Sequence, residues 1–244
     1  TRVIRTGELE DGVVNGDLVL IASGDPNLSQ RPDKNDRLRF VDRDHSYAGF
    51  SEADLVPGDP LQALRKLAVD VAGKGVREIK GDVVVDDGLF TETTDSFVGR
   101  FSAICINDNL VDFTIRPGGK PGDKAVAAWR PDLSPVKVRI QARTVEDGGV
   151  RRLWVETRDG PASFIVKGTI PAGSGPTVRV GKFANPAISA AHLFAALLEN
   201  EGVKINGERQ QAVFGPTVYK DYEEVARHIS PPFSESVRVT LKVS

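Results

Sequence analysis

The amino-acid sequence predicts an α/β protein with an all-β domain inserted into it. Over residues 15–90 an apolar strand, an amphipathic helix and a second apolar strand follow one another, which is the pattern of a parallel βαβ unit with a right-handed crossover. From about residue 97 to 180 the chain instead contains short alternating segments between glycine-rich turns, which is typical of an all-β unit. The α/β pattern resumes from residue 181.

Three elements make up the first α/β part. The run LVLIA, residues 18–22, is apolar throughout, as expected of a strand buried on both faces. In DPLQALRKLAVDVAGKGV the apolar residues recur at helical spacing, with Asp59 as the expected N-cap and Gly73 or Gly75 beyond the end. The apolar strand of EIKGDVVVDDGLF follows. The polar stretch between the first strand and the helix, residues 30–57, predicts an exposed excursion.

The inserted β unit and the second α/β part are equally distinct in pattern. Alternation of apolar and polar residues predicts strands in LVDFTIRPG, VKVRIQART, RRLWVETRD, SFIVKGTIP and PTVRVG. The segment NPAISAAHLFAALLENEG then predicts a helix that stops at Gly202, and a short strand follows it.

Composition excludes several classes of function. The 244 residues carry 34 acidic and 32 basic side chains, so the chain lacks the positive charge that a nucleic-acid-binding surface needs. No apolar run reaches the ~20 residues of a membrane span. A single cysteine, Cys105, allows no disulfide within the chain and is expected to be a buried thiol. The three histidines, at 45, 192 and 228, do not have metal-site spacing, and we expect neither a metal nor a cofactor.

Two patterns offer catalytic residue types without the context that catalysis needs. Asp86 and Asp87 close a strand at a sheet end where α/β proteins place ligands, but Gly88 after them favours an Asx turn. Ser134 and Lys137 match the Ser-x-x-Lys pattern, which requires a helix to bring the amine to the hydroxyl. The following VKVRI alternates as a strand, so these two side chains are expected on opposite faces.

Five segments of the chain, in order, carry a family resemblance: NGDLVLIASGDPNLS, IKGDVVVDDGLF, INDNLVDFTIRPG, NPAISAAHLFAALLENEGVKINGE and SPPFSESVRVTLKVS. Together they resemble the D-alanyl-D-alanine carboxypeptidases/endopeptidases of the low-molecular-mass class C penicillin-binding proteins. Members of this family are longer at both ends, with a Ser-x-x-Lys nucleophile motif upstream and a Lys-Thr-Gly motif downstream. The resemblance therefore implies a partial chain that lies between these motifs.

The resemblance also implies a domain organisation. Residues 1–96 and 181–226 would form the two parts of an α/β accessory domain, and residues 97–180 a small β domain nested within it. Residues 227–244 would re-enter the catalytic domain, whose penicillin-binding-protein/β-lactamase-like fold is otherwise missing from the chain. We expect such a chain, without the nucleophile, to be inactive alone and not to bind penicillin covalently.

Two site residues are implied by the same resemblance. Ser244 would be the first residue of the family's Ser-x-Asn motif, whose serine helps to move protons around the nucleophile. Alternation over residues 237–243 predicts a strand there, whereas the resemblance implies a helix with Ser230 as cap and Pro231 in its first turn, and we expect the helix. Asp95 is the candidate for an acid that reads the free amine of the stem-peptide diamino acid, although the tryptophans that precede this acid in the family are absent.

The implied function is that of a periplasmic or otherwise extracytoplasmic serine D-Ala-D-Ala carboxypeptidase/endopeptidase. Its partners would be peptidoglycan stem peptides and β-lactam antibiotics, and its reaction would pass through an acyl-enzyme without a metal. Two alternatives stay open: a non-catalytic binding or scaffold module of the cell envelope derived from this family, and a serine β-lactamase-like esterase. The oligomeric state is not predicted.

Overall fold

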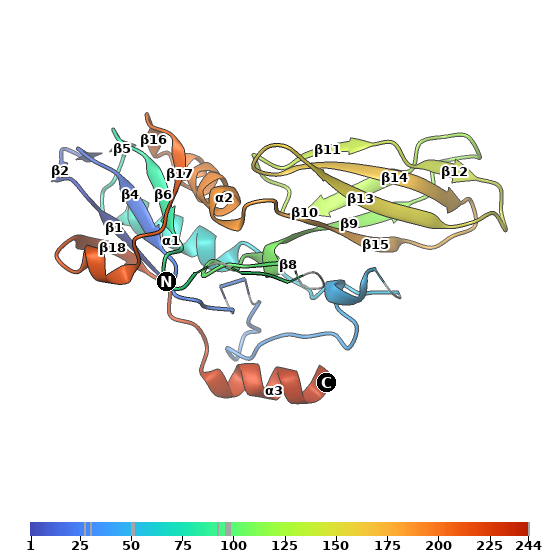
Figure 1. Cartoon of the computed structure of the whole chain (residues 1–244), viewed down its shortest axis with the longest axis horizontal. Helices are drawn as coiled ribbons and strands as arrows, with labels where there is room; N and C mark the ends of the chain where they lie inside the picture. The colour runs from blue at the N-terminus through green and yellow to red at the C-terminus, as the bar shows by residue number, and fades with distance from the viewer. Residues whose placement is uncertain (27, 30, 50–51, 92, 96–98, 244) are drawn as a thin grey trace. The chain divides into compact units, whose positions relative to one another are not determined.

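The computed structural model describes residues 1–243 except 27, 30, 50, 51, 92 and 96–98. Contacts divide the chain into two compact units (Figure 1). Unit 1 comprises residues 1–30, 60–109 and 185–231, and unit 2 comprises residues 31–59, 110–184 and 232–244. The sequence predicts boundaries after residues 96, 180 and 226 instead, and this predicted nesting of domains stays a prediction. The excursion is predicted for residues 30–57, and residues 31–59 belong to unit 2 by their contacts.

A five-stranded mixed sheet forms the centre of unit 1. Its strand order is β17-β6-β4-β1-β18, with bounds Arg209–Ala212, Val83–Asp86, Leu18–Ile21, Arg2–Arg5 and Glu223–Arg227. Strands β4, β6 and β17 are parallel, as the βαβ pattern predicts. Every residue of β4 is buried, which agrees with its uninterrupted apolar run.

Two helices, α1 (Gln62–Gly73) and α2 (Pro186–Asn200), contact each other and this sheet. The side-chain oxygen of Asn185 caps α2 by accepting from the Ile188 backbone N–H at 3.1 Å. The prediction of Asp59 as the cap of α1 is wrong, because the N-cap position is Leu61, which makes no side-chain cap hydrogen bond. Leu61 is buried in the core, so packing determines where this helix begins.

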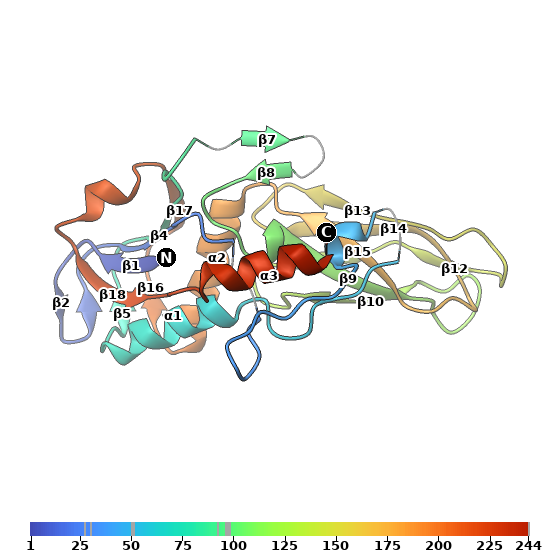
Figure 2. The ribbon, with the colours of Figure 1, turned by 90° about the horizontal axis from the view of Figure 1, so that it is seen from below.

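Smaller elements complete unit 1. A second sheet has the order β16-β5-β3-β2, with bounds Lys204–Ile205, Glu78–Ile79, Val13–Val14 and Leu9–Glu10. Strands β7 (Thr93–Asp95) and β8 (Gly99–Phe101) pair as a separate hairpin (Figure 2). The 3-10 helices η2 (Asn107–Asn109) and η3 (Pro216–Tyr219) lie in the remaining connections.

Two packed sheets form the main part of unit 2. One has the order β10-β9-β15, with bounds Val126–Arg130, Leu110–Arg116 and Thr177–Lys182. The other contains β11, β14, β12 and β13, with bounds Lys137–Ile140, Ser163–Pro171, Arg143–Val145 and Arg152–Arg158. The rings of Phe113 and Phe164, one from each sheet, meet edge to face with centroids 5.6 Å apart. Gly181 allows this packing, since a Cβ there would lie 2.5 Å from the Phe164 ring.

The last segment of the chain is a helix, α3 (Phe233–Val243), rather than a strand. The helix implied by the family resemblance is therefore confirmed, and the strand suggested by alternation is wrong. Ser230 does not cap it, because the helix begins three residues later, at Phe233; the Ser230 hydroxyl donates to the Asp25 carboxylate. The first part of unit 2 includes the 3-10 helix η1 (His45–Tyr47). None of the described helices is long and apolar enough to cross a membrane.

Candidate functional site

Helix α3 leads directly to the predicted site residue Ser244. Ser244 itself lies outside the described residues, so its role stays a prediction. Three apolar residues of α3 lie four apart: Phe233 is 79% exposed, Val237 39% and Leu241 76%. Four-residue spacing places them on one stripe of the helix. This stripe is unpartnered, whereas the polar side of the helix is not.

Two polar side chains of α3 bind the same residue of segment 31–59. The Leu38 backbone N–H donates to the Glu235 carboxylate at 3.0 Å. Arg238 donates to the Leu38 carbonyl oxygen at 2.6 Å and to Glu235 at 2.8 Å, and its guanidinium lies 5.7 Å from the centre of the Phe40 ring. The hydrogen bond from Arg238, together with that from Leu38, holds the pKa of Glu235 below its ordinary value.

The second predicted site residue, Asp95, ends strand β7. Its backbone pairs with Gly99 of β8. Nothing in the described part of the chain tests its proposed contact with an amine, so this assignment also stays a prediction.

The paired carboxylates at the end of β6 hold a turn, as the Asx-turn interpretation predicts. Asp86 is buried and accepts from the Gly88 backbone N–H at 2.8 Å and from the Tyr219 hydroxyl at 2.7 Å. It also accepts from the backbone N–H of Phe214 and Gly215. With these donors the Asp86 carboxylate joins the ends of β6 and β17, and it faces no open site.

Asp87 accepts hydrogen bonds in the same region of unit 1. Its carboxylate accepts from Gln211 at 2.9 Å and from the Ser102 hydroxyl at 2.9 Å. Ser102 in turn accepts from the Ile104 backbone N–H at 3.2 Å. Both aspartates therefore organise loops, and catalysis by this pair is not supported.

Tyr219→Phe tests this interpretation of Asp86. Burial, followed by the hydrogen bond to Asp86, raises the pKa of Tyr219, so the hydroxyl stays a donor at neutral pH. Its removal is expected to lower the free energy of unfolding of unit 1 by about 2 kcal/mol, the typical value for a hydrogen bond to a charged acceptor. Denaturant unfolding measures the change, with the exposed Tyr222→Phe as control. Equal stability of the two variants would contradict the assigned contact.

A second buried network ties segment 31–59 to strand β9. Asp112, which is fully buried, contacts His45 Nδ1 at 2.6 Å and accepts from Arg130 Nε at 2.7 Å. Burial raises the pKa of Asp112, but the hydrogen bonds and charges of His45 and Arg130 outweigh it, and the net pKa lies below the ordinary value. Arg130 also donates to the Val56 carbonyl oxygen at 2.7 Å.

Sequence reasoning missed a third cluster, in unit 1. The Asp25 carboxylate accepts a hydrogen bond from Ser230 and lies 3.7 Å from His228 Nε2. In a Ser-His-Asp triad the serine and the carboxylate bind different nitrogens of the histidine ring. Here the Ser230 hydroxyl lies 3.5 Å from His228 Nε2, the same nitrogen that faces Asp25. The cluster therefore ties the turn after β4 to the segment after β18. Asp25 and Ser230 are 205 residues apart in sequence, so no local spacing could have indicated it.

The remaining candidates lack the environment that nucleophilic catalysis needs. Lys137 is the first residue of strand β11, which confirms that Ser134 and Lys137 do not share a helix. Cys105 is partly exposed as a residue, but its thiol is buried, as expected. Burial raises the pKa of its thiol to about 12, so the reactive thiolate is scarce at neutral pH.

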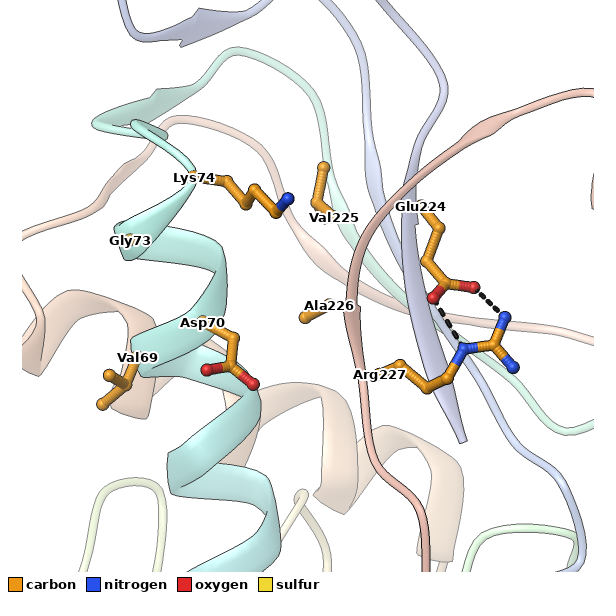
Figure 3. A pocket seen from close by; sticks show the side chains of 8 residues that line it. All are labelled: Val69, Asp70, Gly73, Lys74, Glu224, Val225, Ala226 and Arg227. Atoms are coloured by element: carbon orange, nitrogen blue, oxygen red, sulfur yellow. Dashed lines mark hydrogen bonds and ion pairs between the residues drawn. The ribbon is translucent and has the colours of Figure 1, made fainter.

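One pocket of about 580 Å³ lies in unit 1 between the end of α1 and strand β18 (Figure 3). Within it Glu224 accepts from Arg227 at 2.7 Å, and Asp70 accepts from Lys66 at 2.6 Å. Lys74 extends across the pocket from the end of α1, where a positive charge complements the helix dipole. These interactions account for the charged side chains of the pocket, and we assign the pocket no catalytic role.

Comparison with known protein families identifies the family of this chain. The model of the D-Ala-D-Ala carboxypeptidase 3 (S13) family matches residues 1–244. The chain belongs to this family. A D-alanyl-D-alanine carboxypeptidase from Actinomadura sp. (strain R39) is 24% identical over an alignment 243 residues long, and the match covers 85% of the chain and 44% of the relative.

Two solved structures share the fold of this S13 family chain. Penicillin binding protein 4 from Haemophilus influenzae is similar with a TM-score of 0.71 at 18% identity, covering 99% of the chain and 48% of that protein. The same protein in complex with a novel β-lactam gives a TM-score of 0.68 at 20% identity, covering 99% and 46%. The chain thus spans less than half the length of the relatives it matches.

Proposed function

We propose that this chain forms the accessory domains of a serine-type D-Ala-D-Ala carboxypeptidase/endopeptidase acting on peptidoglycan stem peptides. The family match over residues 1–244 is the observation that carries the proposal. The chain corresponds to 44% of the Actinomadura relative and 48% of the Haemophilus protein, which supports a further, catalytic part. Within the chain, the proposed organisation is an α/β domain with the β domain nested between its two parts.

The proposed reaction proceeds through an acyl-enzyme. A serine outside residues 1–244 attacks the carbonyl carbon between the two D-alanine residues, its proton passes to the leaving amine, and D-alanine departs. Water then attacks the ester and regenerates the serine hydroxyl. Backbone N–H groups would stabilise the oxyanion of each tetrahedral intermediate. A β-lactam would acylate the same serine by opening its ring amide.

Within this reaction Ser244 is proposed as the serine of Ser-x-Asn that assists proton transfer. Two features of α3 support the assignment. Ser244 follows the last residue of a helix, as the resemblance implies. The exposed stripe of Phe233, Val237 and Leu241 is the kind of apolar surface that packs against further protein.

Asp95 is proposed to recognise the free amine of the stem-peptide diamino acid, because a carboxylate complements an ammonium group. The location is proposed to be periplasmic or otherwise extracytoplasmic, since the substrate belongs to the cell wall.

Release of D-alanine tests the proposed function. Full-length protein is incubated with a peptide ending in D-Ala-D-Ala, with the L-Ala-L-Ala peptide and with simple esters. We expect D-alanine from the first peptide only, and no release by residues 1–244 alone. Hydrolysis of esters without peptide cleavage would favour the esterase alternative, and binding of the peptide without cleavage would favour the non-catalytic module.

A further inference from the structure

We infer that segment 31–59 holds helix α3 in place through Leu38 and thereby sets the position of Ser244. This inference rests on the proposed function, in which Ser244 assists catalysis. Glu235 and Arg238 would then be positioning residues, which act on the reaction through Ser244.

The contact between α3 and Leu38 is two-sided. Glu235 accepts from the Leu38 N–H, and Arg238, one turn further along the helix, donates to the Leu38 carbonyl oxygen. Both polar groups of one peptide residue are thus bound by charged side chains, which make stronger hydrogen bonds than neutral ones. The two side chains also bind each other, so each fixes the rotamer of its partner.

Leu38 is itself held in place by burial and by backbone pairing. Its side chain is 2% exposed, and its backbone forms an isolated bridge with Pro32. Beyond it, the segment is tied to the β sheets by the buried Asp112 contacts of His45. Arg179 of β15 adds a hydrogen bond to the Ala48 carbonyl oxygen at 3.0 Å. A continuous set of contacts therefore runs from the sheets of unit 2 to α3.

Within the described residues, α3 is attached through this polar side, while the apolar stripe on its other side is exposed. None of its described residues is buried, and isolated helices of this length are marginal in water. Val243, the last residue of α3, lies five residues beyond Arg238, which corresponds to about 7.5 Å along a helix. A tilt of about 10° at Arg238 would move Val243 by about 1.3 Å, and displacements of this size in an active site slow catalysis up to about 100-fold.

Acylation kinetics of the full-length protein with a fluorescent penicillin test the inference. We expect Arg238→Ala to lower the acylation rate constant about tenfold or more, while the fraction labelled at the end point stays at the wild-type level. Arg238→Lys, which keeps a donor for the Leu38 carbonyl, should recover most of the rate. The matched control is Lys242→Ala, an exposed cation on the same helix, which should label at the wild-type rate.

The two readouts separate positioning from folding. Loss of folded protein would lower the labelled fraction and leave the rate constant unchanged, and this result would overturn the inference. A wild-type rate constant in Arg238→Ala would also overturn it. Absence of labelling in the unaltered full-length protein would instead overturn the proposed function, and the positioning role with it.

Discussion

Ser244→Ala in the full-length protein is expected to slow acylation by penicillin about 100-fold, the usual range for loss of a group that transfers a proton in the transition state. The protein should remain folded, because the change removes one hydroxyl. Stopped-flow labelling with a fluorescent penicillin measures the rate constant. Ser234→Ala provides the control, since Ser234 is exposed in the first turn of the same helix.

Equal rate constants for the Ser244 and Ser234 variants would contradict the assignment of Ser244. A loss of labelled fraction at an unchanged rate would also contradict it, since that pattern reports less folded protein rather than slower proton transfer.

Asp112→Ala is expected to lower the free energy of unfolding of unit 2 by about 3 kcal/mol. The substitution removes the partner of the buried His45 and the half-buried Arg130, and breaking a buried pair typically costs this much. Both tryptophans, Trp129 and Trp154, lie in unit 2, so tryptophan fluorescence during urea unfolding reports on this unit. Asp132→Ala, at an exposed carboxylate of the same unit, should change stability by less than about 0.5 kcal/mol.

The loss of stability in Asp112→Ala is expected to depend on pH. Because the pKa of Asp112 in the folded chain lies below its ordinary value of 3.8, its contribution to stability is complete above pH 3.8. That contribution disappears as the pH falls through the lower, folded-state pKa. The difference in stability between wild type and Asp112→Ala should therefore narrow only in acid. A difference that stays constant down to pH 2 would contradict the assigned contacts.

Local sequence patterns correctly predicted the elements that are buried along most of their length. Strand β4 is an uninterrupted apolar run, and helix α2 is a mostly apolar sequence with a capping residue, so each element can be recognised from its own residues. Alternation misled at residues 237–243, because Val237 and Leu241, and likewise Val239 and Val243, are also four residues apart and can share a helix face. The family resemblance corrected this prediction, since it drew on the whole segment rather than on the period alone.

Long-range contacts could not be predicted from spacing. The attachment of His45 to Asp112 and of Ser230 to Asp25 joins residues 67 and 205 positions apart. The attachment of α3 to Leu38 arises in the same way, from a polar excursion whose sequence showed no periodicity. The cap of α1 was misplaced because burial of Leu61 overrode the preference of Asp59 for an N-cap.

Mapping the acylated residue tests the account most directly. Full-length protein would be labelled with penicillin, digested and analysed by mass spectrometry. The account predicts a single adduct, on a serine outside residues 1–244. An adduct on any residue of this chain, Ser134 or Ser244 included, would contradict it.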